Sequence, residues 1–481
     1  MKVYNSLSFQ KEDFKTIDPN IVKMYVCGPT VQEGPHLGHA KSAVAFDLIH
    51  RYLKFKGYKV KIVKNYTDID DKIIKKSNEL NIDFKKLGEK NIEEYEEIMK
   101  LLNIEPETLN PRATEVIPFM IDFIKTLIDK GNAYVSKDGS VYFSVNSFPK
   151  YDNILQKVKN AEAEDELEDY SEDQDTVGED KLDNRDFALW KKMKEGEPYW
   201  ESPWGKGRPG WHIECSAMVL NFLGDTIDIH GGGQDLKFPH HRNEIAQSES
   251  YTGKPFAHYF LHNGFVNVDN EKMSKSLGNF FLVSELVKKY DPMVIRYFLI
   301  SSHYRSSVNF SLEIMEQAEK NYKKLVNTIK KVNEVEIIEK TSKDIDKLLS
   351  KMETALSNII KALDDDFDTP VAIAEIMTLF KEINKIILEK KVSITEEFKD
   401  KFLQFIEKID NIFGLFPDLK REFKYGLAVN LDEKDDKINN LIKIITDIRN
   451  ELRQKKNFEL SDRIRKRLNE LGISLEDKKL K

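Results

Sequence analysis

The sequence predicts an α/β protein in which a parallel sheet is interrupted by an inserted subdomain and followed by a helical bundle. Three observations predict this fold class: four short β-rich segments end on small or polar residues, helical patterns separate several of them, and a long Lys- and Glu-rich helical region follows. With 481 residues, of which 40% are hydrophobic, the chain has room for about three or four domains of roughly 100 to 200 residues each.

The predicted strands are IVKMYVC (21–27), YKVKIVKNY (58–66), DTIDIHGGG (225–233) and AHYFLHNG (257–264). Helical stretches such as FDLIHRYLKFKG lie between several of them and indicate β-α-β units in a parallel sheet. Ligands of such sheets bind at the carboxyl ends of the strands. We therefore expect one crevice to be faced by Cys27, Asn65, His230 and His262.

About 150 residues separate the second strand from the third, which is far more than a simple crossover needs, so we expect an inserted subdomain. This region contains the hairpin-like stretch YVSKDGSVYFSV. Between Glu162 and Asp186, thirteen Asp or Glu residues stand against two basic residues. Such a composition predicts a solvated, partly disordered excursion.

After about Asn309 the sequence is typical of packed helices, as in SLEIMEQAEKNYKKLVNTIKKV and LLSKMETALSNIIKALDDD. The tripeptide DTP (368–370) supplies an N-cap and an N1 proline for one of them. At the carboxyl end, residues 441–481 hold twelve Lys or Arg and seven Asp or Glu, a difference of +5, although the whole chain carries a net charge of −7. A local basic face can bind a nucleic acid in spite of an acidic average.

The first residues lack the apolar core of a signal peptide, and no stretch approaches the roughly 20 apolar residues that cross a bilayer. We therefore expect a cytoplasmic protein without a membrane partner. Its two cysteines, Cys27 and Cys215, are far apart in the sequence, and a disulfide between them is not expected in that compartment. They are either buried thiols or metal ligands.

The segment FPHHRNEIA (238–246) places His240 and Glu244 on one helix face, whereas His241 should point about 100° away. With Cys27 and Cys215 this pair forms a Cys₂HisGlu set that suits zinc. Two buried thiols and an ordinary helix start explain the spacing equally well. The segment lacks the HExxH pattern of metalloproteases, which disfavours a hydrolase.

In GPHLGHA, His36 and His39 precede a helical pattern, where free N–H groups favour anions. By itself this spacing is more typical of histidines with ordinary partners. Farther along, EKMSKSLGN (271–279) holds Lys272 and Lys275 in a polar loop. These lysines are either part of a charged surface turn or could neutralise charge on a transferred phosphate.

HLGH (36–39) together with KMSKS (272–276) resembles the paired signature of class I aminoacyl-tRNA synthetases. More narrowly, MYVCGPTV, NYTDIDDKI, RPGWHIECSAM, IHGGGQDLKFPHHRNEIAQS and EKMSKSLGNFF resemble the cysteinyl-tRNA synthetase family, with related segments from residue 3 to about 477. The resemblance implies a Rossmann-type catalytic domain in 1–125 and 225–270, an inserted connective subdomain in 126–224, a lysine loop and stem-contact region in 271–310, a helical bundle in 311–420, and a small C-terminal anticodon-binding domain in 421–481.

The resemblance also implies roles for individual residues. It assigns zinc to Cys27, Cys215, His240 and Glu244, and ATP and catalysis to His36, His39, Lys272 and Lys275, with Asp235 near the nucleotide. Around the substrate cysteine it places Gly28, Thr67, Trp211 and His230. To the anticodon it assigns Arg453, Asp462 and Asp477, for which ordinary helix-face charge is the alternative. Arg242, the long acidic excursion and the tail LEDKKLK depart from the family pattern.

The implied activity is the ligation of L-cysteine to tRNA(Cys) through an adenylate, with ATP and Mg²⁺ as substrate and one Zn²⁺ per chain. We expect a monomer. A ligase that passes activated cysteine to a small amine is one alternative, although the basic carboxyl end argues against it. A catalytically silent nucleic-acid-binding relative is another, and the intact HLGH and KMSKS segments argue against that one.

Overall fold

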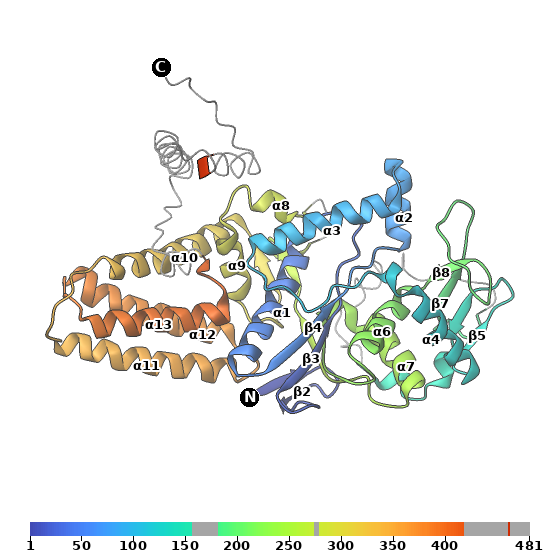
Figure 1. The fold of residues 1–481 in the computed structure, drawn as a ribbon, viewed down its shortest axis with the longest axis horizontal. Coiled ribbons are helices and arrows are strands. Elements are labelled where there is room, and N and C mark those ends of the chain that lie inside the picture. The colour runs from blue at the N-terminus through green and yellow to red at the C-terminus, as the bar shows by residue number, and fades with distance from the viewer. Residues whose placement is uncertain (156–180, 274–278, 418–459, 462–481) are drawn as a thin grey trace, which may run out of the picture. The chain divides into compact units, whose positions relative to one another are not determined.

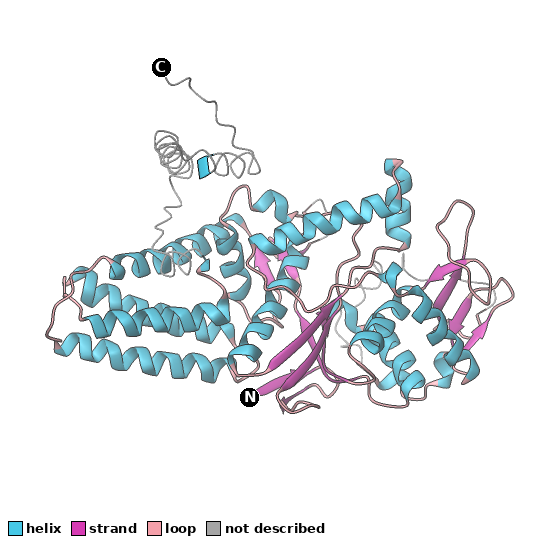
Figure 2. Cartoon of the chain, in the orientation of Figure 1, coloured by secondary structure: helices cyan, strands magenta, loops and turns pink. Residues whose placement is uncertain are grey.

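The computed structural model describes residues 1–155, 181–273, 279–417 and 460–461. The chain divides into two compact units, residues 1–416 and 417–481. All helices and strands named below belong to the first unit, which Figures 1 and 2 show as a sheet flanked by helices, with a bundle of long helices at one end and a smaller sheet at the other. Within the described residues, no helix is both long enough and apolar enough to cross a bilayer.

The central sheet has four parallel strands in the order β10-β9-β3-β4. Their bounds are Ile21–Val26 (β3), Lys59–Lys64 (β4), Ile227–Gly233 (β9) and Ala257–Asn263 (β10). The four predicted strands and their parallel arrangement are therefore confirmed. Six of the seven residues of β9 are buried, as expected of a strand covered on both faces. Tyr25 lies opposite His230 on one side and Val63 on the other, which aligns the carboxyl ends of these strands.

Helices connect the strands of this sheet. Helix α1 (Leu37–Phe55) follows β3, and α2 (Asp71–Leu80) and α3 (Phe84–Leu101) follow β4. Helix α6 (Trp211–Phe222) precedes β9, and α7 (His240–Thr252) joins β9 to β10. Because α6 packs on α7, residues from both helices reach the same edge of the sheet.

Between β4 and β9 the chain forms α4 (Ile117–Asp129) and an antiparallel sheet with the order β5-β6-β7-β8. Its strands are Ala133–Val135, Val141–Phe143, Phe187–Lys192 and Gly207–Pro209. The first two pair as the hairpin that YVSKDGSVYFSV predicts. Most of the predicted acidic excursion, residues 162–180, lies outside the described residues, and in the described part Arg185 pairs with Asp152 and Asp183.

An N-terminal hairpin, β1 (Lys2–Asn5) and β2 (Gln10–Asp13), precedes the central sheet. After β10 come β11 (Val266–Val268), β12 (Glu271–Lys272) and β13 (Val308–Phe310), with α8 (Val283–Leu286) and α9 (Pro292–Ile300) between the last two. The predicted bundle then consists of α10 (Leu312–Asn333), α11 (Lys343–Leu363), α12 (Thr369–Ile383) with the π-helical turn Asn384–Glu389, and α13 (Glu396–Phe413). In the DTP segment, Asp368 caps α12, and Pro370 is its second residue rather than its first.

A buried arginine, Arg296, joins the sheet region to the bundle. Asp47 of α1 contacts Arg296 of α9, and both side chains have 0% exposure. Arg296 also donates to the carbonyl oxygens of Phe413 at 2.7 Å and Leu102 at 2.9 Å. The guanidinium thus ties α1 to the ends of α3 and α13, so the helix that starts with HLGH is held by three distant chain segments.

Candidate active site

The four predicted metal ligands converge at the carboxyl edge of the sheet. Cys27 directly follows β3, Cys215 lies on α6, and His240 and Glu244 lie one turn apart on α7. Their ligand atoms all lie within 4.8 Å of one another. Cys27 is 9% exposed, while the other three are at most 2% exposed. Cys27 is therefore the most exposed of the four ligands.

The distances fit a tetrahedral zinc site. Two thiolates, each about 2.3 Å from a tetrahedral zinc ion, stand about 3.8 Å apart. The Sγ atoms of Cys27 and Cys215 are 3.8 Å apart. Glu244 Oε1 lies 3.7 Å from Cys27 Sγ and 2.9 Å from His240 Nε2. Two sulfurs, an imidazole nitrogen and a carboxylate oxygen are donors that zinc accepts.

A second group of possible ligands overlaps the first. It consists of Cys27, His230, His241 and Glu244. His241 Nε2 lies 3.3 Å from Cys27 Sγ, so the prediction that His241 points away from the cluster is wrong. The start of α7 lies close enough to the end of β3 for His241, as well as Glu244, to contact Cys27. His241 Nδ1 is 2.8 Å from His262 Nε2, which places His262 behind the cluster.

Charge in the cluster is set by burial and by close neighbours. Burial raises the pKa of the Glu244 carboxyl, but His230 and His240 lower it more, so the pKa lies well below its ordinary value. Burial lowers the pKa of His240, while Glu244 and Cys215 raise it, to about 10. A metal ion at His240 Nε2 must therefore displace a proton from the imidazole.

Two residues of α6 that the sequence analysis did not single out complete the surroundings of the cluster. His212 Nδ1 lies 3.0 Å from His240 Nδ1, on the side of that ring away from Glu244. Glu214 is 1% exposed and accepts a hydrogen bond from Thr67 Oγ1 at 2.9 Å. His212 could have been found from GWHIECSAM, since it precedes Cys215 by three residues and so shares its helix face.

The predicted substrate residues border the cluster. The Trp211 ring stacks on His240 with centroids 4.2 Å apart, and His230 Nε2 lies 3.7 Å from Cys27 Sγ. The Gly28 N–H donates to Asn65 Oδ1 at 2.8 Å. A Cβ at position 28 would lie 1.6 Å from the Asn65 carbonyl oxygen, so only glycine fits where β3 and β4 end. Cys27, Asn65, His230 and His262 thus lie near one another, all four are buried, and the crevice they were expected to face stays a prediction.

The HLGH segment forms the start of α1, as predicted. His36 is the N-cap, and its Nδ1 accepts from the backbone N–H groups of Gly38 at 3.1 Å and His39 at 3.4 Å. The rings of His36 and His39 stack with centroids 3.6 Å apart. This end of α1 thus displays two imidazoles beside the N–H groups of the first helical turn.

The ends of the lysine loop lie against HLGH. Leu37 N donates to the Phe281 carbonyl at 3.1 Å, and a Cβ at Gly38 would lie 3.7 Å from Met273 Cε. The two halves of the predicted signature are therefore neighbours. Lys272 ends β12, whereas Lys275 lies outside the described residues.

The remaining residues singled out in the sequence are Asp235, Arg242 and the three assigned to the anticodon. Asp235 lies in the short 3₁₀ helix Gln234–Lys237 after β9, at the same edge of the sheet. Arg242 donates to the Leu155 carbonyl at 3.1 Å and lies over the Phe238 ring. The predicted anticodon residues Arg453, Asp462 and Asp477 lie outside the described residues.

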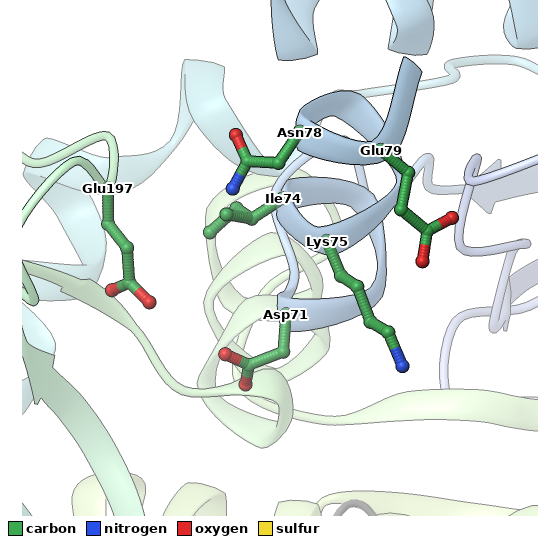
Figure 3. A pocket seen from close by; sticks show the side chains of 6 residues that line it. All are labelled: Asp71, Ile74, Lys75, Asn78, Glu79 and Glu197. Carbon is green, nitrogen blue, oxygen red and sulfur yellow. The ribbon is translucent and has the colours of Figure 1, made fainter. Parts of the chain in front are cut away.

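A hollow of about 500 Å³ lies elsewhere, between α2 and the loop before β8 (Figure 3). It is lined by Asp71, Ile74, Lys75, Asn78, Glu79 and Glu197. Asp71 pairs with Lys191 at 3.0 Å and also contacts Arg208, so the hollow borders a junction between α2 and the inserted sheet. None of the predicted site residues lines it.

Comparison with known proteins gives two family matches. The tRNA synthetases class I (C) catalytic domain matches residues 13–320, and the DALR domain matches residues 358–417, which lie within the bundle. Solved structures share the fold: Mycobacterium tuberculosis methionyl-tRNA synthetase in complex with methionyl-adenylate aligns with a TM-score of 0.59 at 16% identity, over 82% of this chain and 90% of that one.

Curated relatives match almost the whole chain. The cysteine–tRNA ligase of Thermodesulfovibrio yellowstonii is 46% identical over 488 residues, covering 99% of this chain and 98% of that protein. The cysteine–tRNA ligase of Thermococcus gammatolerans is 45% identical over 482 residues, covering 99% and 97%. The chain therefore belongs to the cysteine–tRNA ligase family of class I aminoacyl-tRNA synthetases.

Proposed function

We propose that this enzyme ligates L-cysteine to tRNA(Cys) in two steps and that zinc, held by Cys27, Cys215, His240 and Glu244, selects cysteine by its thiol. The first step forms cysteinyl-adenylate from cysteine and ATP with Mg²⁺, and the second transfers cysteine to the 3′ adenosine. The observation that carries the proposal is the convergence of these four ligand atoms within 4.8 Å at the end of β3, the strand that leads into HLGH.

Selection of cysteine over serine needs more than shape. A pocket that contacts two groups of nearly equal size and shape favours one substrate over the other by only about 10²-fold in kcat/KM. Bound zinc would supply a soft Lewis acid that accepts a thiolate readily and a serine hydroxyl poorly. The site holds two cysteine sulfurs and an ionised carboxylate as donors for such an ion, and Cys27 is the most exposed of its four ligands.

The protein's own groups would then orient the reactants. Trp211 and Thr67 border the cluster and limit where the rest of the cysteine can lie. His36 and His39 stand at the start of α1, where the positive end of the helix dipole favours an anion, which suits the phosphates of ATP. We assign Lys272 and Lys275 the stabilisation of charge on the leaving pyrophosphate, with Asp235 near the nucleotide. Held in place, the cysteine carboxylate attacks the α-phosphate without a strong base.

The variant Cys27→Ser tests the metal part of the proposal. We expect it to lose zinc, measured by elemental analysis, and to lose cysteine-dependent ATP–pyrophosphate exchange, while its circular dichroism stays that of the parent. Cys215→Ser, on a different helix, should behave in the same way. Normal cysteine activation in a folded Cys27→Ser protein without zinc would rule out thiol selection by the metal.

We also propose that tRNA is the acceptor and that Arg453, Asp462 and Asp477 contact its anticodon within residues 421–481. The full-length match to cysteine–tRNA ligases and the basic carboxyl end support a tRNA acceptor over a small amine. A tRNA substrate also favours a cytoplasmic enzyme, for which we propose a monomer. Charging of a tRNA(Cys) transcript, against a small-amine acceptor as control, distinguishes the two. Sedimentation of the purified protein checks the monomer.

A further inference from the structure

Three hydrogen bonds form a chain beside the two cysteines. Gly28 N donates to Asn65 Oδ1 at 2.8 Å, Asn65 Nδ2 donates to Thr67 Oγ1 at 3.2 Å, and Thr67 Oγ1 donates to Glu214 Oε2 at 2.9 Å. Gly28 directly follows Cys27, and Glu214 directly precedes Cys215. The chain thus runs from the end of β3, across the segment after β4, to the first turn of α6.

The backbone N–H of Gly28, where this series of hydrogen bonds starts, fixes which group donates in each of the three bonds. A backbone N–H can only donate, so Asn65 must turn its oxygen toward Gly28 and its amide nitrogen toward Thr67. Thr67 must accept from that nitrogen. Its single hydroxyl hydrogen is then directed to Glu214, which accepts it whether or not the carboxyl carries a proton on its other oxygen.

This arrangement leaves the Thr67 oxygen with one lone pair to spare. A hydroxyl oxygen accepts two hydrogen bonds, and among the described residues only one side chain, that of Asn65, donates to it. Because the hydroxyl hydrogen is held by Glu214, the oxygen faces any further neighbour as an acceptor. A substrate cysteine bound to the metal by its thiol could fill this position with a hydrogen-bond donor, and its donor group is the α-ammonium.

Glu214 itself has no structural ion pair. Glu214 is 1% exposed. Among the described residues, no Lys, Arg or His nitrogen lies within 4.0 Å of its carboxylate. A buried carboxyl group is costly to keep unless it has hydrogen bonds. The bond from Thr67 is therefore the described interaction that explains a glutamate at this position.

We propose that Glu214 is a positioning residue that fixes the Thr67 hydroxyl as an acceptor for the α-ammonium group of the substrate cysteine. The proposal rests on the proposed function, because the thiol must be held at the metal for the ammonium to reach Thr67. It adds amine recognition to thiol recognition, so that the site reads both ends of the amino acid.

The test compares two variants at position 214 in the full-length, zinc-loaded enzyme. Glu214→Leu removes the acceptor, and we expect it to raise the KM for cysteine in pyrophosphate exchange by about tenfold or more, with the KM for ATP unchanged. Glu214→Gln keeps an acceptor oxygen and is the matched control, expected to stay within about threefold of the parent. A Glu214→Leu enzyme that retains zinc and an unchanged KM for cysteine overturns the proposal, as does equal loss in both variants.

A double-mutant cycle checks that Glu214 acts through Thr67. Thr67→Val removes the hydroxyl, and adding Glu214→Leu to it should cost no further affinity for cysteine. Independent, multiplying losses would show that Glu214 acts by another route. If Glu214→Leu proves unable to hold zinc, Thr67→Val and Thr67→Ser decide: an unchanged KM for cysteine in Thr67→Val contradicts the proposal, and a raised KM that Thr67→Ser restores supports it.

Inhibition by 3-mercaptopropionate, which has the thiol and carboxylate of cysteine but no amine, separates this proposal from the proposed function. We expect it to inhibit the parent and Glu214→Leu equally, since it makes no ammonium contact. Weakening of this inhibitor by Glu214→Leu to the same extent as cysteine would overturn the amine role. No inhibition of the parent would instead count against thiol binding at the metal, and the KM comparison would still decide the role of Glu214.

Discussion

Replacement of Asp47 by asparagine should destabilise the protein strongly, although Asp47 lies in none of the predicted motifs. Its carboxylate accepts from Arg51 Nε at 2.8 Å and from the backbone N–H of Glu105 at 2.8 Å, and it contacts Arg296. The substituted amide would keep one acceptor oxygen but lose the charge. The guanidinium of Arg296, with 0% exposure, would then lack its buried counter-ion.

Breaking one partner of a buried ion pair costs about 3–5 kcal/mol, because the remaining charge is neither paired nor hydrated. Arg296 keeps its bonds to the carbonyls of Phe413 and Leu102, which offset part of that cost. We therefore expect a loss of about 3 kcal/mol for Asp47→Asn. The double variant Asp47→Leu with Arg296→Met should lose less unfolding free energy than the two single variants lose together, because neither buried charge remains.

Urea unfolding measured by circular dichroism in the far ultraviolet is the suitable assay. The four tryptophans, Trp190, Trp200, Trp204 and Trp211, all lie in or beside the inserted sheet, so their fluorescence does not report on α1, α9 and α13. The matched control is Asp225→Asn, which breaks an exposed pair with Lys254 in which the Lys254 and Asp225 side chains are 59% and 51% exposed. Exposed pairs contribute about 0–1 kcal/mol.

At acidic pH, the free energies of unfolding of the parent and of Asp47→Asn should differ less than at pH 7. Burial raises the pKa of Asp47, but Arg296 and Arg51 lower it more, so its pKa in the folded protein is below the ordinary value. The stabilising effect is then fully present above the unfolded pKa of about 3.9 and is lost as the pH falls through the folded pKa. A loss below about 1 kcal/mol at pH 7, equal to that of the exposed control, would refute this account of the buried pair.

Three further predictions concern the site. Gly28→Ala should abolish cysteine activation in pyrophosphate exchange, because a Cβ there would lie 1.6 Å from the Asn65 carbonyl oxygen; a fully active variant would show that the ends of β3 and β4 can separate freely. His36→Asn should keep the N-cap of α1 and lose ATP-dependent activation, whereas His36→Ala should also lose about 1 kcal/mol in urea unfolding; equal stability of the two would contradict the capping role. Removal of residues 421–481 should abolish tRNA charging but leave pyrophosphate exchange near the parent rate, and loss of both would place part of the activation site in that segment.

Sequence patterns predicted the central sheet well because its strands are rich in β-branched and aromatic residues and end on small or polar residues. Each of the segments 21–27, 58–66, 225–233 and 257–264 became a parallel strand within a few residues of its predicted bounds. The HLGH helix start was predictable for a similar reason, since a capping side chain and helix N–H groups are local features.

The surroundings of the metal ligands were harder to predict. Helix periodicity correctly placed His240 and Glu244 on one face, but it gave the wrong expectation for His241. Periodicity describes directions about a helix axis and contains no information on how near the next element lies. Because the end of β3 lies close to the first turn of α7, His241 contacts the Cys27 sulfur although it points in a different direction from His240.

The role of Glu214 could not be predicted from the sequence, because it depends on a hydrogen bond with a residue far away in the chain. A glutamate in the first turn of a helix is ordinarily explained by the helix dipole, and nothing in GWHIECSAM distinguishes that use from a buried contact. The distinction comes from Thr67, which is 147 positions away and lies beside Glu214 because the end of β4 and the start of α6 meet.

The ligands and their supports therefore depend on the sheet rather than on any local loop. Cys27 and Cys215 are 188 positions apart, yet their sulfurs lie 3.8 Å apart because β3 and α6 end and begin at the same edge. In zinc fingers the ligands are close in sequence and the metal directs local folding. Here each ligand lies on an element that the surrounding core already holds, so metal binding should complete a folded site rather than create it. Cys27→Ser should accordingly lose zinc while it keeps its helices, and collapse of its helical signal would show instead that the metal holds the sheet edge together.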